Sequence, residues 1–248
     1  IADTISYGLV FKPHWLKGFS GSIDYYDIDL SGALATTTAQ GTLDQCKAGI
    51  AAQCALITRD PATNNIQQII IQQINLNGRQ IKGIDFDLSY NLDLGPGKLN
   101  VRSVFTNTID YIDKIGTARI QSAGWFSTAN NLAFPKWRGN LNATYSVGNY
   151  SIFVQERYIG SYLQMPPIAG QIFAEPKIPA VYYTDVTLSA KLKLFGADAE
   201  VYATANNLFK KRPPFVANRF AANLGFPTIP TLYDLDNGYY TIGTRIKF

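Results

Sequence analysis

The feature that most restricts the fold of this sequence is a two-residue alternation between apolar and polar side chains. From 182 to 194 the even positions carry Tyr, Thr, Val, Leu and Ala, whereas the odd positions carry Tyr, Asp, Thr, Ser and Lys. The same period runs through 83–92, 137–147 and 239–248. Because successive side chains of a strand point to opposite faces, each segment predicts a β-strand with one apolar wall and one polar wall.

The length of these segments separates two kinds of sheet. A soluble antiparallel sheet can also have one wet face, but its strands are usually ~5–6 residues long. A tilted strand that crosses a membrane needs ~9–11 residues, and the alternating segments reach that length with aromatic residues near their ends. No run approaches the ~18 apolar residues of a membrane helix. The sequence therefore predicts an all-β chain that crosses a membrane by strands, and its low charged fraction of 16% suits that class.

Nine strands are predicted, and their connections alternate strictly between short and long. The stretches 32–71, 113–134, 164–179 and 209–237 are long, and the connections that alternate with them are tight turns. Short turns at one end of a sheet and long loops at the other are typical of outer-membrane barrels. The predicted strands are 5–12, 18–31, 72–91, 98–112, 135–147, 150–163, 180–194, 198–208 and 238–248.

Nine strands are not expected to close into a barrel by themselves. Single-chain bacterial barrels have an even number of strands, and an open sheet edge leaves unpaired amides in hydrocarbon. The sequence therefore predicts a transmembrane antiparallel β-barrel segment. Its two edge strands are expected to pair with further strands, from the same polypeptide or from another chain.

Two pairs of carboxylates stand out within the predicted strands. Asp27 and Asp29 occupy positions that continue an apolar wall, which indicates that this strand leaves the bilayer there or contains a bulge. Asp85 and Asp87 share the polar wall of another strand. Paired acids can act in catalysis, but the lining of a barrel lumen is the commoner role, and we predict it for both pairs.

Catalytic and nucleic-acid-binding functions lack support in the sequence. It contains no nucleophile elbow, no His-Glu-x-x-His and no phosphate loop. The net charge of +4 is spread along the chain without a basic stripe. The one histidine, His14, falls at the short-turn end, and the turn Asp234–Gly238 lacks the acid that an EF-hand needs at its twelfth place. We predict no enzymatic activity, no metal, no cofactor and no nucleic-acid partner.

Several stretches resemble TonB-dependent outer-membrane receptors of the proteobacterial type. Ala205–Pro214 resembles their penultimate strand with its Asn-Leu-Phe box, and Trp15–Ile28 looks like another recurrent strand. Ile57–Thr63 followed by Lys82–Asp85 resembles a subgroup that has a cysteine-bearing loop. The last eight residues have the pattern of an outer-membrane assembly signal, whose polar, glycine, hydrophobic and aromatic places fall on Thr241, Gly243, Ile246 and Phe248.

The resemblance implies a fold and a function that the residues alone do not give. These receptors have 22-stranded barrels, so 1–248 corresponds to the last nine strands. A plug domain and a TonB box, which lie N-terminal in the family, are not recognised in this sequence. The implied function is TonB-coupled uptake of a siderophore, vitamin or oligosaccharide by a multi-pass barrel of the bacterial outer membrane. A passive outer-membrane pore and a structural barrel without transport are the alternatives.

The resemblance also implies partners and candidate sites. The partners are the remaining strands and plug of the receptor, TonB-ExbB-ExbD, the barrel-assembly machinery, outer-membrane lipid and a small-molecule nutrient. Cys46 and Cys54 are predicted to form a disulfide, because an oxidising compartment favours it and no further metal ligands lie near them. Substrate contacts are expected from loop aromatics, arginines and their neighbours, namely Arg119, Trp125, Phe126, Gln164, Met165, Arg219 and Phe220.

Overall fold

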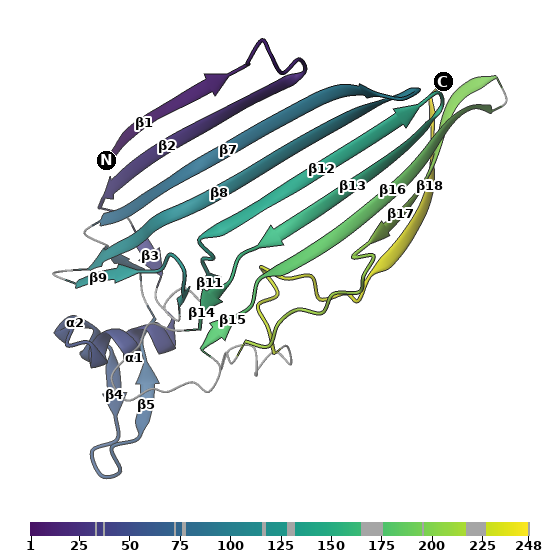
Figure 1. The fold of residues 1–248 in the computed structure, drawn as a ribbon. Coiled ribbons are helices and arrows are strands. Elements are labelled where there is room, and N and C mark those ends of the chain that lie inside the picture. Colours follow the sequence, from purple (N-terminus) through teal and green to yellow (C-terminus); the bar gives the residue numbers. More distant parts are fainter. Residues whose placement is uncertain are drawn as a thin grey trace.

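The main element of the molecule is a ten-stranded antiparallel sheet (Figure 1). The computed structural model describes residues 1–32, 34–36, 38–71, 73–75, 78–115, 118–127, 132–164, 176–194, 196–216 and 227–247. Nine strands follow one another across the sheet in chain order, and β9 (Ala118–Gln121) pairs with the end of one of them, β8. The nine are β1 (Ala2–Phe11), β2 (Phe19–Ser31), β7 (Gly78–Leu94), β8 (Gly97–Ile115), β12 (Trp137–Val147), β13 (Tyr150–Ile159), β16 (Val181–Leu194), β17 (Ala197–Asn206) and β18 (Tyr239–Lys247).

The nine predicted strands are confirmed, with differences only at their ends. The third strand, predicted from residue 72, begins at Gly78, and the sixth ends at Ile159 rather than at 163. Two of the tight turns need a left-handed backbone, which glycine adopts without a steric penalty. Gly95 has a φ of 57° and Gly148 a φ of 55°, and each begins the two-residue connection of a hairpin.

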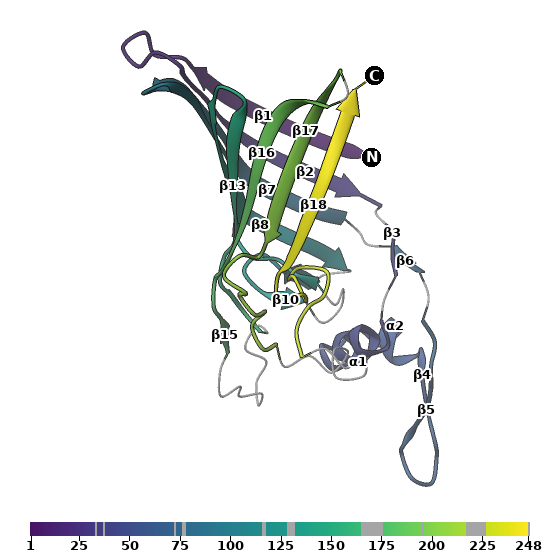
Figure 2. The same ribbon diagram turned by 90° about the vertical axis from the view of Figure 1, so that its right-hand side faces the viewer.

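The sheet curves into an open trough, with β1 and β18 as its two edges (Figures 1 and 2). The short turns lie at one end of the strands and the long connections at the other, which we call the loop end. This arrangement confirms the expected segregation of connections by length. The fold class is therefore an antiparallel β-barrel segment, as the alternation predicted.

The long connections contain secondary structure of their own, which the sequence analysis did not predict. The first holds two helices, α1 (Ala39–Lys47) and α2 (Ala51–Cys54). Thr38 begins α1 as its N-cap, because its hydroxyl accepts a hydrogen bond from the Gly41 amide at 3.0 Å. The remaining short strands pair as β3 (Leu34–Thr36) with β6 (Gln73–Asn75), β4 (Ile57–Arg59) with β5 (Ile66–Ile69), β10 (Phe126–Ser127) with β11 (Leu132–Ala133), and β14 (Tyr162–Leu163) with β15 (Lys177–Ile178).

The register of the strands gives the sheet an apolar wall and a polar wall. Leu188 lies opposite Ile152 on one neighbour and Ala203 on the other, and Ala203 lies opposite Ile242. The apolar wall is bare: Leu188 is 55% exposed and Ile242 is 81% exposed. Monomeric soluble proteins rarely expose a continuous apolar surface of this extent, so this wall needs lipid or another apolar cover.

Aromatic side chains of the apolar wall gather in two rows. Near the short turns, Phe19 packs between Phe11 and Tyr90, with ring centroids 5.7 and 6.2 Å apart. Nearer the loop end, Tyr158 contacts Phe105 and Tyr182 at 6.2 and 4.9 Å. Rows of aromatic residues at two heights are the pattern of interfacial girdles around a membrane barrel. No helix of the described part of the chain is long and apolar enough to span a membrane.

One prediction about the carboxylates is wrong. The register between β2 and β7 is continuous here, with Tyr25 opposite Ile84 and Asp27 opposite Lys82. Asp27 and Asp29 therefore lie on the same apolar wall as Tyr25 and do not line the lumen. Each carboxylate forms an ion pair, to Lys82 at 2.9 Å and to Lys114 at 2.7 Å. The pairing of β2 with β7 shows no register shift at this point, so a bulge in β2 is not the cause. The strand instead continues past the apolar band toward the loop end.

The second pair of carboxylates does lie on the polar wall. Asp85 accepts a hydrogen bond from the Thr106 hydroxyl at 2.7 Å, and Asp87 forms an ion pair with Arg102 at 2.7 Å. Both interactions cross from β7 to β8. Cross-strand pairs of this kind stabilise neighbouring strands, so these acids need no catalytic role to explain them.

Candidate functional site

The polar wall carries cross-strand ion pairs along its length. Arg102 pairs with Asp87 at mid-strand, and Arg245 pairs with Glu200 at 3.0 Å near the short turns. At the loop end, Arg79 binds Asp113 through two hydrogen bonds of 2.6 and 3.2 Å. The Arg79 guanidinium also lies 5.0 Å from the Tyr111 ring centroid, and that ring packs at a tilt against Phe134, with centroids 4.4 Å apart. The pair therefore connects the wall to the segment that follows β9.

A compact apolar core, the loop cluster, covers the polar wall at the loop end. It joins three long connections to the ends of β13 and β16. A backbone hydrogen bond from the Leu163 amide to Gly124 links two of these connections, and one from the Val216 amide to Pro227 lies within the third, both at 2.9 Å. The loop cluster consists of Phe126, Ala133, Ile159, Tyr162, Ile178, Val181, Tyr183, Val216, Ile229 and Tyr233.

Two tyrosines hold the interior of the loop cluster together. The Tyr233 hydroxyl donates a hydrogen bond of 3.1 Å to the Tyr162 hydroxyl, and both side chains are 3% exposed. Burial raises the pKa of the Tyr162 phenol and raises the pKa of Tyr233 to about 12. Both phenols therefore stay protonated at physiological pH, and the hydrogen bond between them persists.

A recess opens beside the loop cluster, between the polar wall and the segment that leads into β18. Its volume is about 440 Å³. The wall contributes side chains from four adjacent strands, and the segment covers them with five consecutive residues. The recess is lined by Gln155, Arg157, Asp185, Asn206, Pro230, Thr231, Leu232, Tyr233, Asp234 and Tyr239. Volume and polar lining suit a small hydrophilic ligand.

Some of the residues that were predicted to contact a substrate lie close together, and two of them are covered by other loop residues. Phe126 and Gln164 are each 4% exposed, so in this conformation they are packed within the loops. Trp125 is half-buried and forms an isolated β-bridge with Leu163, the residue that precedes Gln164 in the chain. Arg119 lies apart from them on β9, exposed, with its guanidinium 3.4 Å from the Gln80 side-chain oxygen.

Three further candidates, Met165, Arg219 and Phe220, lie outside the described residues. The side chains that form the recess were missed because candidates were sought only in long loops. Arg157 and Asp185 occupy polar positions within alternating strands, so the alternation itself contained the signal. Among the described residues, no group of His, Cys, Asp and Glu is placed to hold a metal ion.

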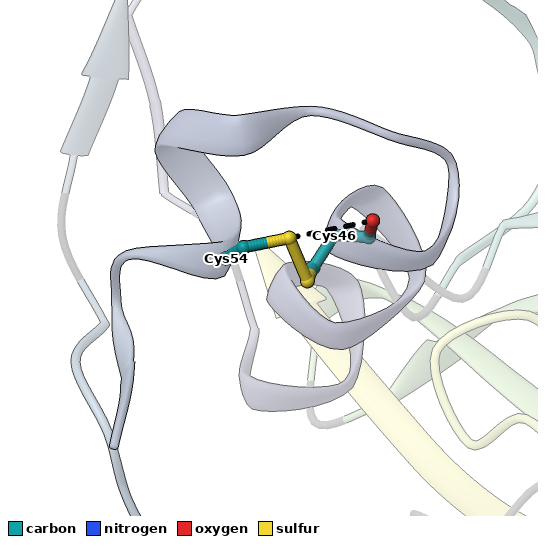
Figure 3. The surroundings of a disulfide bond; sticks show 2 residues. All are labelled: Cys46 and Cys54. Atoms are coloured by element: carbon teal, nitrogen blue, oxygen red, sulfur yellow. Dashed lines mark hydrogen bonds between the residues drawn. A yellow bond between two sulfur atoms is a disulfide. The ribbon is translucent and has the colours of Figure 1, made fainter. Parts of the chain in front are cut away.

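The predicted disulfide between Cys46 and Cys54 is present, with an S–S distance of 2.04 Å. Figure 3 shows that it joins the end of α1 to the end of α2. The hairpin of β4 and β5 follows directly and extends away from the sheet (Figures 1 and 2). The disulfide thus closes a small ring around the turn between the two helices.

Opening this ring is expected to have a local effect. In the Cys46→Ser/Cys54→Ser variant, the helix pair should lose about 2.5 kcal/mol of local stability, because the unfolded ring gains conformational freedom. The sheet does not depend on it, so the thermal unfolding of the barrel should stay unchanged. Hydrogen exchange of amides 39–54 and heat modifiability on gels measure the two parts separately. Faster exchange throughout the strands would contradict this local role.

Comparison with known proteins places the fold. The family model for the TonB dependent receptor-like β-barrel matches residues 1–208. The siderophore receptor PirA from Acinetobacter baumannii aligns with a TM-score of 0.60 and 12% identity, over 99% of this chain and 32% of that one. A single-residue variant of the ferric enterobactin receptor PfeA from Pseudomonas aeruginosa gives 0.61 and 12%, over 99% and 31%.

These likenesses show the fold and its extent. At 12% identity a structural match carries no statement about ligand, and this chain spans about a third of the solved receptors, as the 32% and 31% coverages give. None of the curated proteins that were compared matches it. Because the family model matches most of its length and its strands follow that fold, the chain belongs to the TonB-dependent receptor β-barrel family.

Proposed function

We propose that this chain forms part of the wall of an outer-membrane receptor for TonB-coupled uptake of a scarce small-molecule nutrient. The observation that carries the proposal is the sheet itself. One wall is bare and apolar with two aromatic rows, the other is polar, and loops cover the polar wall at one end only. A sheet of this kind suits a barrel with lipid outside and a hydrophilic passage inside.

The two edges of the sheet support the involvement of further strands. The described part of the sheet ends at β1 and β18, and each of them has only one neighbour. Unpaired amides in hydrocarbon cost several kcal/mol per group, so a membrane position needs both edges to be paired. We propose that the remaining strands and a plug domain of the same receptor supply this pairing and fill the lumen. TonB-ExbB-ExbD would act through the plug.

A ferric siderophore is the first ligand class to test, ahead of vitamins and oligosaccharides. The aligned structures include receptors named for a siderophore and for ferric enterobactin, although their 12% identity supports only a common fold. The recess and the loop cluster lie at the end from which a ligand outside the cell would arrive. The proposed site is thus the polar wall at the loop end, with the seven loop candidates retained as secondary contacts.

Whole-cell uptake tests this function. The gene for the complete receptor should be deleted and restored in the native host, and uptake of radiolabelled iron siderophores, cobalamin and oligosaccharides should be compared. We expect restored uptake of one class that ceases when TonB is deleted or a protonophore is added. Uptake that continues without TonB would support the passive pore instead, and no uptake of any class would favour the structural barrel.

The glycine of the proposed assembly signal has a packing reason that can be tested. Gly243 on β18 lies opposite Tyr202 on β17, and an added Cβ at Gly243 would overlap the Tyr202 ring. Gly243→Val is therefore expected to lower the amount of heat-modifiable, folded receptor in the outer membrane several-fold. The double variant Gly243→Val/Tyr202→Ala should recover much of it. Failure of this recovery would show that the glycine is needed for recognition by the barrel-assembly machinery and not for packing.

A further inference from the structure

Arg157 lines the recess and has two carboxylate partners, which also line it. On the wall, its Nε lies 3.2 Å from Asp185 Oδ2, and on the segment that leads into β18 its Nη2 lies 3.3 Å from Asp234 Oδ2. Beneath it, the guanidinium carbon lies 5.1 Å from the centroid of the fully buried Tyr183 ring. The planar cation is thus fixed by an aromatic face and a wall carboxylate, with one edge turned to the recess.

The two carboxylates are not equivalent. Asp185 uses both oxygens in the wall, because its Oδ1 also accepts the Asn207 amide at 2.8 Å. Asp234 offers Arg157 one oxygen at 3.3 Å, and its other oxygen accepts the Asp236 amide at 3.3 Å. Two-point arginine pairs elsewhere on the polar wall are shorter, such as Arg79 with Asp113 at 2.6 Å. Asp234 is therefore the partner that an incoming anion can replace.

We propose that Arg157 binds the carboxylate of an anionic ligand in this recess, and that Asp234 occupies the same position when no ligand is present. The inference deepens the proposed function, on which it rests, by naming a contact residue and the chemistry that it selects. No proton or covalent bond changes in this exchange. One carboxylate leaves the guanidinium and another takes its place, so the charge at Arg157 stays compensated.

The exchange couples ligand binding to the covering segment. Once Asp234 is displaced, the residues after Tyr233 lose their contact with Arg157, whereas Tyr233 stays held by its hydrogen bond to Tyr162. The Asn207 side-chain amide also holds the Asp236 carbonyl at 3.2 Å, so the expected movement is confined to residues 234 and 235. Because the two carboxylates compete for Arg157, a change at Asp234 that weakens its contact with Arg157 should tighten anion binding, by at most the factor by which that contact is weakened.

Citrate binding to the full-length receptor in detergent micelles, measured by calorimetry, tests the assignment. Asp234→Asn removes the competing charge and should tighten citrate binding about twofold to fivefold, the range for a partly exposed ion pair. Asp185→Asn also removes a negative charge beside Arg157. Because it removes the wall carboxylate that holds the guanidinium in place as well, it should not tighten binding. Arg157→Gln should abolish the binding, and Arg102→Gln, which alters a pair elsewhere on the wall, should leave it unchanged.

A second measurement follows the covering segment. Leu235 is 39% exposed, so a label there is accessible. A nitroxide attached to the cysteine of Leu235→Cys should become more mobile when citrate is added. In Asp234→Asn the label should already be mobile without citrate. Sucrose should have no effect. Equal tightening by Asp234→Asn and Asp185→Asn would show a general charge effect and overturn the proposal, as would citrate binding that survives Arg157→Gln. The outcome does not depend on nutrient uptake, so it can fail while the proposed function stands.

Discussion

Replacing Leu188 by arginine is expected to lower the free energy of unfolding of the complete barrel by about 2–4 kcal/mol, the cost of a cation near the bilayer midplane. Leu188 lies midway along the apolar side of β16, between Tyr182 and Leu194, and its side chain is 55% exposed. More than half of it is left bare by the described part of the chain, so in a membrane its surroundings are lipid chains. Urea titration of the full-length receptor in lipid vesicles measures the change.

Thr144→Arg provides the matched control for this prediction. Thr144 lies on the polar wall of β12 and pairs with Phe153 on β13. Ile152, the residue before Phe153, pairs with Leu188, so the two substituted positions lie within one residue of the same row of paired residues in the sheet. An arginine at 144 can reach water in the lumen and should change the unfolding free energy little. Equal costs at the two positions would mean that the two walls do not differ in environment, and the membrane assignment would fail.

Breaking the ion pair between Arg79 and Asp113 should have the next largest effect. The Asp113 side chain is 9% exposed and that of Arg79 is 23% exposed, so Asp113→Leu leaves a largely covered guanidinium without its carboxylate. We expect a loss of about 2–3 kcal/mol, somewhat below the cost for a fully buried pair. The same guanidinium covers Tyr111, whose ring packs against Phe134, so the described residues 122–127 and 132–136 should also loosen. Hydrogen exchange of those residues measures this second effect.

Two variants separate the pair from its surroundings. Arg79→Met/Asp113→Leu removes both charges and should recover much of the stability, because no uncompensated charge remains. Asp198→Asn disrupts a pair with Lys193 whose side chains are 71% and 72% exposed, and it should have little effect. If the double variant is no more stable than Asp113→Leu alone, the loss comes from packing and not from the unpaired charge.

The strands could be predicted from the sequence because their signal is local. In β16 the alternation of Val186, Leu188 and Ala190 with Thr187 and Ser189 needs only the period of a strand and two different solvents. The segregation of long connections to one end followed from the same strand assignments. The disulfide between Cys46 and Cys54 was also within reach, since the chain has no other cysteine.

The loop end could not be predicted in the same way, because its structure depends on contacts between distant segments. Phe126 was expected at a binding surface, yet residues from two other connections bury it. Asp27 was expected to line the lumen, and only the pairing with Lys82 shows that it lies on the apolar wall. Arg157 gains its candidate role from Asp185 and Asp234, which follow it by 28 and 77 residues. No periodicity within one strand contains that information.

The most direct test of the central claim is an accessibility scan along β16 in the full-length receptor, reconstituted in lipid vesicles. Single nitroxide labels at positions 185–192 report collision with oxygen, which concentrates in lipid, and with a water-soluble nickel complex. We predict a two-residue period, with oxygen access highest at 186, 188, 190 and 192, and nickel access highest at 185, 187, 189 and 191. Water access at the even positions, or no alternation, would contradict a wall between lipid and lumen.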